Sequence, residues 1–359
     1  MKESGNLKFK KLLLALNIFL ILIFTGCTDT NTDSQTYNSD IVIKGLSLKI
    51  SLIQTAYEIY NTNIGNPSYF NESLYKETSK EAHSHYKWLK NTYSNMDDEM
   101  RNCLENIFTS KDTWEYTNAV INLNDDASID EILNTLNSDK YLNLSNFLKK
   151  DVDKFFTYFY DEHFKSYLKK NEDKYTEKAI DLNQKLSDND VDVMNFVETS
   201  SGIKLKQDYK SVMYYNLNPF ESQSFEYNNI MVSTINSNTT AIDIVSIPFY
   251  KYSRHLFDTF TNSDEFLDIC NQLKSDKKLM SMYNDFAKDS YTFNDWCAEN
   301  LISGFSKFLD YKYYGSTYEN ASYVYDLDFY NYLKKTGFNP SKISLKDISI
   351  DFYKNIINL

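Results

Sequence analysis

Glycine and proline are scarce in this chain, with 8 Gly and 4 Pro among 359 residues, about a quarter of average usage. Turns with positive φ depend on glycine, so this scarcity argues against β-sandwiches, β-barrels and glycine-rich nucleotide-binding loops. It also excludes collagen-like chains. Aromatic residues are abundant instead, with 30 Tyr and 24 Phe, and they supply enough apolar area for a core. We therefore expect a mainly α-helical protein with a small β-sheet.

The N-terminus carries a segment typical of exported proteins. Four lysines, at positions 2, 8, 10 and 11, precede a run of thirteen residues, 12–24, that is apolar except for Asn17. Thr25 and Gly26 then lead directly into Cys27. Small residues before a cysteine at the end of such a run resemble the lipobox of bacterial lipoproteins, in which the cysteine is lipidated and becomes the new N-terminus.

This resemblance implies that residues 1–26 are a lipoprotein signal peptide and that Cys27 is the lipidation site. Phe24 departs from the Leu that usually occupies its position. The alternative is a transmembrane anchor followed by an unrelated cysteine. The apolar run of thirteen residues is, however, too short for a stable transmembrane helix. We expect a mature protein anchored through lipid on the extracytoplasmic face of a bacterial cell membrane.

Positive charge is in short supply, and almost all of it comes from lysine. The chain has a net charge of −12, and loss of residues 1–26 removes four Lys and one Glu and takes it to −15. Arginine occurs only at positions 101 and 254. Because nucleic-acid backbones require a basic surface, we expect no nucleic-acid partner. An acidic exterior suits solubility outside the cell.

Three cysteines, Cys103, Cys270 and Cys297, remain once Cys27 is lipidated. No two of them are close in the sequence, so the chain has no CxxC metal or redox motif. A disulfide between Cys270 and Cys297 would join two predicted helices, and the sequence leaves this alternative open.

Composition divides the mature chain into three parts. Residues 27–40 are polar and predict a flexible tether. Residues 41–205 carry helical periodicity, most clearly over 151–186, where an aromatic stripe predicts core packing rather than a ligand groove. Residues 206–359 begin with β-favouring runs and continue as helices, which predicts a small sheet followed by a helical C-terminal region.

The alternation of apolar residues predicts short strands. They cover Leu46–Leu52, Tyr209–Leu217, Asn229–Ile235 and Ala241–Ile247. The sheet itself is expected between Lys206 and Ile247, and the first helix after it is expected to begin at Phe249.

Four histidines limit the possible metal and catalytic sites. His83 and His85 form an HxH pair on a predicted helix, where residues two apart point about 200° apart and cannot chelate one ion. We therefore expect both on the surface, and His163 on the polar side of the Phe-rich helix. His255 differs because it lies on the first helix after the predicted sheet.

Most of the chain resembles a known family in the order of its segments. The segments are Phe155-Phe156, Val197–Ile203, Asn216–Pro219, the His255 helix, Trp296–Ile302 and Thr336–Phe338. In this order they resemble a bacterial domain-of-unknown-function family of secreted, gluzincin-like zinc metallopeptidases. The resemblance covers roughly residues 46–357 and implies a zincin-like helical domain, with a short sheet before the helix that bears the family's HEFxH motif.

The motif is incomplete when it is carried over residue by residue. His255 matches the first zinc ligand, Phe257 matches the family's Phe, and Glu299 matches the acidic ligand on a later helix. Leu256 stands where the catalytic Glu belongs, and Thr259 stands where the second His belongs. The proton acceptor and one imidazole ligand that a zincin requires are therefore absent.

A weaker ligand set remains in the same region. Asp258 lies three residues after His255 and would join it and Glu299 as an oxygen ligand for a divalent metal. Because no general base remains, the resemblance implies a pseudo-metallopeptidase rather than an enzyme. We expect no resident cofactor, zinc being the one candidate.

The expected role is binding or structural, with a peptide or a cell-surface molecule as partner besides the membrane. Two alternatives stay open. One is an active metallopeptidase with rearranged ligands, and the other is a carbohydrate- or peptide-binding lipoprotein unrelated to zincins. The sequence contains no GxSxG nucleophile elbow and no phosphate-binding glycine loop that would indicate another enzyme class.

Replacement of Cys27 tests the predicted export. Because the lipid is attached to the cysteine thiol, Cys27→Ala removes the anchor and the processing site together. We expect the variant to leave the membrane fraction or to retain residues 1–26, measured by detergent phase partitioning and by intact mass. Anchoring and processing like the wild type would contradict the lipobox interpretation.

Overall fold

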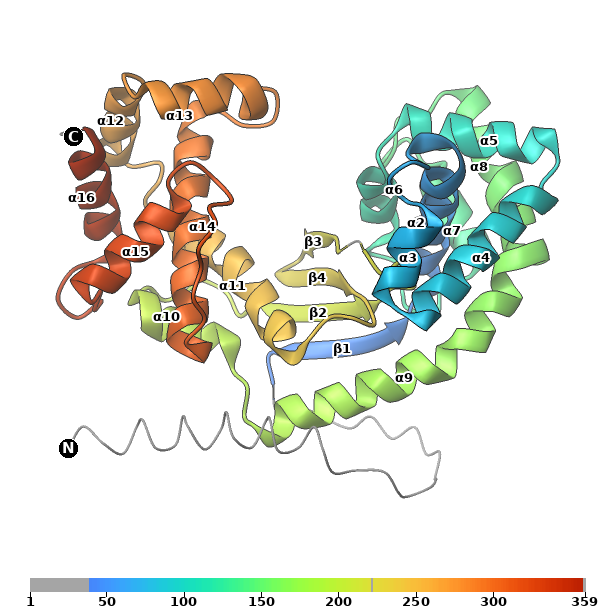
Figure 1. Ribbon diagram of the computed structural model, residues 1–359, viewed down its shortest axis with the longest axis horizontal. Coiled ribbons are helices and arrows are strands. Elements are labelled where there is room, and N and C mark those ends of the chain that lie inside the picture. The colour runs from blue at the N-terminus through green and yellow to red at the C-terminus, as the bar shows by residue number, and fades with distance from the viewer. Residues whose placement is uncertain (1–38, 221, 358–359) are drawn as a thin grey trace. The chain divides into compact units, whose positions relative to one another are not determined.

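The computed structural model describes residues 39–220 and 222–357 (Figure 1). The predicted signal peptide, Cys27 and all but the last two residues of the predicted tether lie outside this range. The described chain is mainly α-helical with one small four-stranded sheet, which confirms the predicted fold class. Within it, no helix combines the length and the apolar character needed to cross a bilayer.

The sheet consists of three parallel strands and one antiparallel edge strand, which lie side by side in Figure 1. Their order is β1 (Ile41–Leu46), β2 (Lys210–Tyr215), β4 (Ile230–Ile235) and β3 (Ser224–Tyr227). β3 turns back onto β4 through Asn228 and Asn229, both with positive φ. Asparagine tolerates this conformation better than most residues, so the turn forms without glycine.

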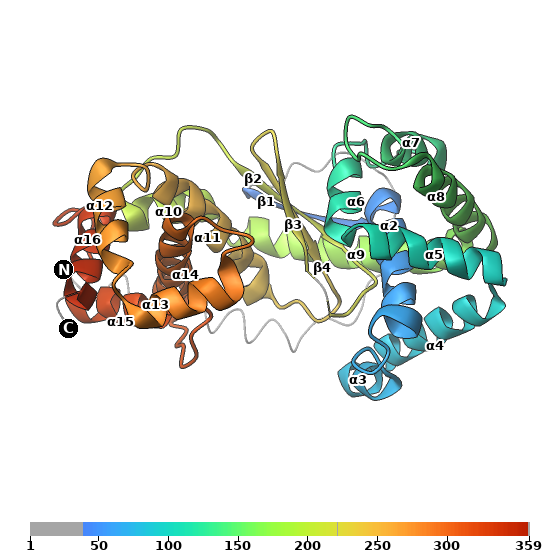
Figure 2. The same cartoon turned by 90° about the horizontal axis from the view of Figure 1, so that it is seen from above.

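The connection from β1 to β2 is a long helical region. It contains α2 (Leu48–Tyr60), η1 (Asn61–Gly65), α3 (Glu72–Thr78), α4 (Lys80–Asn95), α5 (Asp98–Ser110), α6 (Thr113–Val120), α7 (Ile129–Leu136), α8 (Asn146–Phe159), η2 (Tyr160–Phe164), α9 (Lys165–Asp188) and α10 (Val193–Ser201). Segments η1 and η2 are single π-helical turns. α9 runs along β1 in both views (Figures 1 and 2).

A second helical region follows β4. It contains α11 (Ala241–Asp258), α12 (Asp264–Leu273), α13 (Lys277–Met282), the π-helical turn η3 (Tyr283–Ala287), α14 (Phe293–Tyr314), α15 (Asp326–Thr336) and α16 (Leu345–Ile357). α11 packs against α10 and α14, and α14 packs against α15. Cys270 on α12 and Cys297 on α14 are buried free thiols.

Side-chain caps start many of these helices. Reciprocal capping boxes join Ser128 to Glu131, Thr240 to Asp243 and Thr292 to Asp295. In each box the hydroxyl accepts a backbone N–H bond and the acid accepts one in return, which satisfies two donors that a helix start leaves free. Polar side chains thus define helix boundaries in a chain with little glycine.

Two of the predicted strands are wrong. The apolar alternation over Leu46–Leu52 spans the last residue of β1 and the start of α2. Ala241–Ile247 forms the first two turns of α11, because the capping box at Thr240 starts a helix and outweighs the β-branched residues that follow. The sheet is also not confined to residues 206–247, since β1 comes from the beginning of the described chain.

The predicted helix over residues 151–186 is present as the succession α8, η2 and α9. Its stripe is core, as predicted, and four of its side chains are fully buried: Phe155, Phe156, Phe159 and Phe164. The π-helical turn η2 changes the helical register within the stripe. Tyr167, which follows this turn, is only half-buried and lines a pocket.

Asn183 on α9 covers the outer edge of the sheet. β1 is an edge strand, so its outward backbone groups need partners other than a strand. Asn183 Oδ1 accepts a hydrogen bond from Ile43 N at 2.8 Å, and its Nδ2 donates to Ile43 O at 2.6 Å. The side-chain amide therefore replaces a neighbouring strand and fixes α9 along β1.

Replacement of Asn183 tests this edge contact. Asn183→Leu leaves a buried N–H and a buried C=O without partners, so we expect the free energy of unfolding to fall by about 3 kcal/mol. Urea unfolding followed by circular dichroism measures the loss. The neighbouring Gln184 is exposed, and Gln184→Ala should stay within about 0.5 kcal/mol of wild type. Equal effects of the two changes would contradict the proposed role of the amide.

Candidate functional site

Glu299, the acidic residue singled out in the C-terminal region, is already satisfied by its own chain. It lies on α14 and is 1% exposed. Arg254 on α11 forms an ion pair with one carboxylate oxygen, and Tyr250 donates a hydrogen bond to the other. Burial and the neighbouring Glu299 raise the pKa of Tyr250, so its phenol remains a donor.

His255 faces a different set of groups. Its ring stacks on Tyr209 with 4.3 Å between ring centroids. Its Nε2 lies 3.0 Å from Oε2 of Glu226 on β3, at an angle outside hydrogen-bonding geometry. Asp258 is exposed at the last position of α11.

The candidate ligands His255, Asp258 and Glu299 do not form a metal site. Among the described residues, no group of three or more His, Cys, Asp and Glu side chains is arranged to hold a metal ion. Leu256 is fully buried, and Thr259 Oγ1 donates within its own helix to Leu256 O at 2.6 Å. A zinc ion on Glu299 would also have to displace a guanidinium. These residues therefore do not fit zinc, and no catalytic step follows from them.

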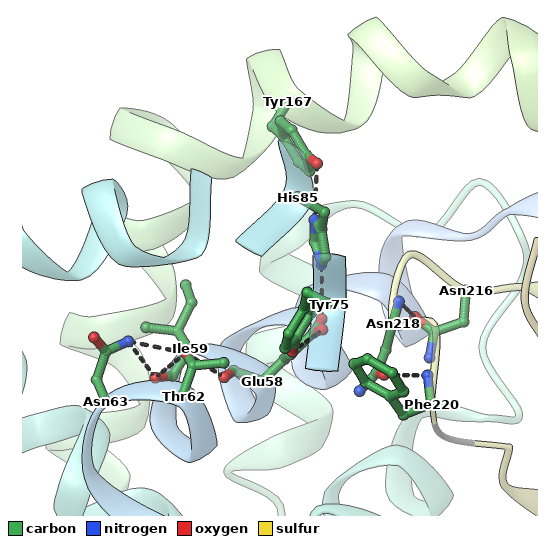
Figure 3. A network of polar contacts seen from close by, with 10 residues as sticks. All are labelled: Glu58, Ile59, Thr62, Asn63, Tyr75, His85, Tyr167, Asn216, Asn218 and Phe220. Atoms are coloured by element: carbon green, nitrogen blue, oxygen red, sulfur yellow. Dashed lines mark hydrogen bonds and ion pairs between the residues drawn. The ribbon is translucent and has the colours of Figure 1, made fainter. Parts of the chain in front are cut away.

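A second polar centre, drawn in Figure 3, links α2, α3, α4 and α9. Glu58 on α2 is 1% exposed, and its Oε1 accepts a hydrogen bond from Tyr75 Oη at 2.6 Å. Its Oε2 lies 2.7 Å from His85 Nε2, and His85 Nδ1 lies 2.8 Å from Tyr167 Oη. Glu58, His85 and Tyr167 thus form a continuous hydrogen-bonded relay.

The exposure predicted for His85 is wrong, because this side chain is 5% exposed. His83 points away from it, as predicted for residues two apart on a helix, and lies 2.7 Å from the exposed Glu72. The face of α4 that carries His85 packs toward α2, where the Glu58 carboxylate gives the imidazole a buried partner. The sequence predicts the divergence of the two rings but not the partner.

The relay ends at a pocket of about 570 Å³ between α4 and α9, here called the α4–α9 pocket. Helices α4 and α9 form two of its walls, and short segments after β2 and β4 complete it. His85, Trp88 and Tyr167 all line it. The Trp88 and Tyr167 rings stack with 3.8 Å between centroids and 12° between planes. Stacking and the relay together hold the Tyr167 ring in one orientation.

Lysines dominate the charge of the α4–α9 pocket. Lys80, Lys170 and Lys174 line it, and Glu81 is the one carboxylate among its lining residues. Glu81 pairs with Lys174, and this contact lowers the pKa of the Glu81 carboxyl. The lining therefore carries two more positive than negative charges, in a chain whose net charge is −12.

The relay is suited to hydrogen bonding rather than to proton abstraction. Burial raises the pKa of the Tyr167 phenol, and the nearby Glu58 carboxylate raises it further. The phenol therefore stays protonated at neutral pH and is a poor base or nucleophile. What it offers to a bound molecule is a positioned hydroxyl group.

Sequence reasoning does not identify Glu58, Trp88 or Tyr167 as site residues. Tyr167 continues the apolar stripe of its helix and is therefore assigned to the core. The available signal is Glu58, an acid within the otherwise uncharged and largely apolar run Ile50–Ile59. Because a buried carboxylate requires partners, such an acid points to a polar network in the core.

Comparisons of the chain with protein-family models, curated proteins and solved structures find no match. The resemblance to gluzincin-like metallopeptidases therefore rests on the sequence segments alone. The function has to be argued from the pockets and side chains of this chain itself.

The Arg254–Glu299 pair gives a test of the closed C-terminal centre. Arg254→Leu leaves a buried carboxylate unpaired, so we expect the free energy of unfolding to fall by about 3 kcal/mol in urea. The chain's other arginine provides the control. Arg101→Leu breaks a pair with the exposed Asp98 and should cost about 1 kcal/mol or less. A larger loss for Arg101→Leu would contradict this assignment.

Proposed function

We propose that this chain is a lipid-anchored, extracytoplasmic binding protein that holds an anionic ligand in the α4–α9 pocket. The observation that carries the proposal is the excess of lysine in this one pocket of an acidic chain. The anchor is the lipid predicted on Cys27, and the partner is a molecule at the cell surface. The pseudo-metallopeptidase hypothesis for residues 206–359 is compatible with this role, because both describe binding without catalysis.

Charge supports an anionic ligand. Most of the surface of a chain with net charge −12 repels anions, so a local excess of lysine creates a distinct attractive region. Lys80 and Lys170 are exposed. Neither forms an ion pair with another described residue. Their charge remains available to a ligand, whereas that of Lys174 is shared with Glu81.

Shape and lining support a small or medium-sized ligand. A volume of about 570 Å³ lies within the usual range for ligand pockets. Aromatic rings from Trp88, Tyr167 and Tyr175 provide apolar wall area, and the lysines provide charge. Such a combination of apolar walls with a few placed polar groups is typical of binding sites.

The predicted location at the membrane surface also supports a binding role. A lipid on Cys27 would confine the described domain to the membrane surface, where ligands of the cell envelope are concentrated. Binding then requires no catalytic residue, which agrees with Leu256 and Thr259 at the motif positions and with the protonated Tyr167 phenol.

Charge reversal in the pocket tests the proposal. Thermal unfolding of residues 27–359 is measured with a panel of acidic oligosaccharides, acidic peptides and aromatic carboxylates, since a ligand raises the melting temperature by mass action. We expect at least one class to stabilise the wild type. Lys80→Glu with Lys170→Glu should abolish that shift.

The control variant carries the same change in net charge elsewhere. Lys288→Glu with Lys335→Glu alters two exposed lysines that do not line the pocket, and it should keep the wild-type shift. Equal loss of the shift in both double variants would point to general electrostatics. That result, or the failure of every anion class, would overturn the proposed function.

A further inference from the structure

We infer that the ligand of the α4–α9 pocket is an acidic oligosaccharide. This inference rests on the proposed binding function and names the chemical class of the ligand. It depends on the polarity of the Glu58–His85–Tyr167 relay, on the Trp88 ring and on the helical character of the pocket walls.

The relay and the imidazole tautomer within it together decide which hydrogen-bonding group Tyr167 presents. The Glu58 carboxylate has only acceptors, so both Tyr75 Oη and His85 Nε2 donate to it. In the tautomer that carries a single proton, on Nε2, Nδ1 is an acceptor and takes the Tyr167 O–H at 2.8 Å. In this tautomer the Tyr167 oxygen has lone pairs left for the pocket but no proton.

In this tautomer the ligand group that faces Tyr167 is a donor, although the charge of the pocket selects an anion. A simple carboxylate or a phosphodiester has acceptors alone and would leave the free lone pair of the Tyr167 oxygen without a donor, which costs binding free energy. The ligand that meets both demands carries hydroxyl donors and negative groups on one framework. Acidic sugars have this composition.

The aromatic wall favours a sugar ring over a flexible chain. The Trp88 indole is half-buried and stacked on Tyr167, so the orientation of its ring is fixed before a ligand binds. An indole face is electron-rich and attracts the slightly positive C–H groups on one face of a sugar ring. A rigid ring also loses less conformational freedom on binding than an acidic peptide of equal charge.

The pocket walls disfavour an extended peptide for another reason. Peptides commonly bind by adding a strand to a sheet edge, where backbone groups are unpaired. The two long walls here are α4 and α9, whose backbone groups are bonded within the helices. Along these two walls a peptide would meet side chains alone, as a saccharide does, and a chain of acidic residues has no ring to place on Trp88.

Three probes with matched charge or matched hydroxyl groups separate these alternatives. Trigalacturonate has three carboxylates and sugar hydroxyls, its trimethyl ester keeps the rings but has no charge, and N-acetyl-triglutamyl amide has three carboxylates without rings. We expect trigalacturonate to bind at least ten-fold more tightly than either of the others in isothermal titration calorimetry.

Tyr167→Phe removes the acceptor and keeps the ring that stacks on Trp88. We expect it to weaken trigalacturonate binding about ten-fold, with the melting temperature used to confirm that the variant is folded. Tyr141→Phe, at an exposed tyrosine outside the pocket lining, should bind like the wild type.

The outcomes distinguish this inference from the proposed function. Equal or tighter binding of the triglutamyl probe, or tight binding of the methyl ester, would overturn the oligosaccharide inference, and full affinity in Tyr167→Phe would overturn the role given to the Tyr167 oxygen. The first and third of these would leave an anion-binding pocket in place. Absence of binding by every anion, by contrast, would overturn the proposed function as well.

Discussion

The buried carboxylate of Glu58 constrains the arrangement of the N-terminal helices. A charge that is 1% exposed is stable only where hydrogen bonds replace its lost water. Tyr75 from α3 and His85 from α4 supply those bonds, so both helices must turn these side chains toward α2. His85 then positions Tyr167 on α9. The α4–α9 pocket follows from this arrangement, because its two helical walls are joined through the relay.

Helix α9 connects the pocket to the sheet. Tyr175 of α9 lines the pocket and packs on Tyr215 of β2 with 5.2 Å between ring centroids. Two turns further along, Asn183 pairs with the backbone of β1. One wall of the pocket is therefore fixed to a strand edge by hydrogen bonds. Preorganisation of this kind lowers the entropy that a ligand loses on binding.

Local patterns predict the fold class, but long-range partners decide the sites. Periodicity places the 151–186 helix correctly, whereas no local pattern joins Glu58 to His85 across 27 residues. His255 and Glu299, the two residues matched to zinc ligands, lie on α11 and α14, which pack against each other. Arg254 meets Glu299, and His255, about 100° further round the helix, faces β3 instead.

The two buried carboxylates differ in what their partners leave available. The charge of Glu299 is balanced by the Arg254 guanidinium, so this centre does not attract a further cation. Glu58 is hydrogen-bonded to the Tyr75 phenol and to the His85 imidazole. The second nitrogen of that imidazole is hydrogen-bonded to the Tyr167 hydroxyl at the pocket wall. The Arg254–Glu299 pair stabilises the fold and leaves no group free for a ligand, whereas the relay ends in a hydroxyl that lines a pocket. This difference is the physical reason to propose ligand binding at the N-terminal helices rather than in the C-terminal region around His255.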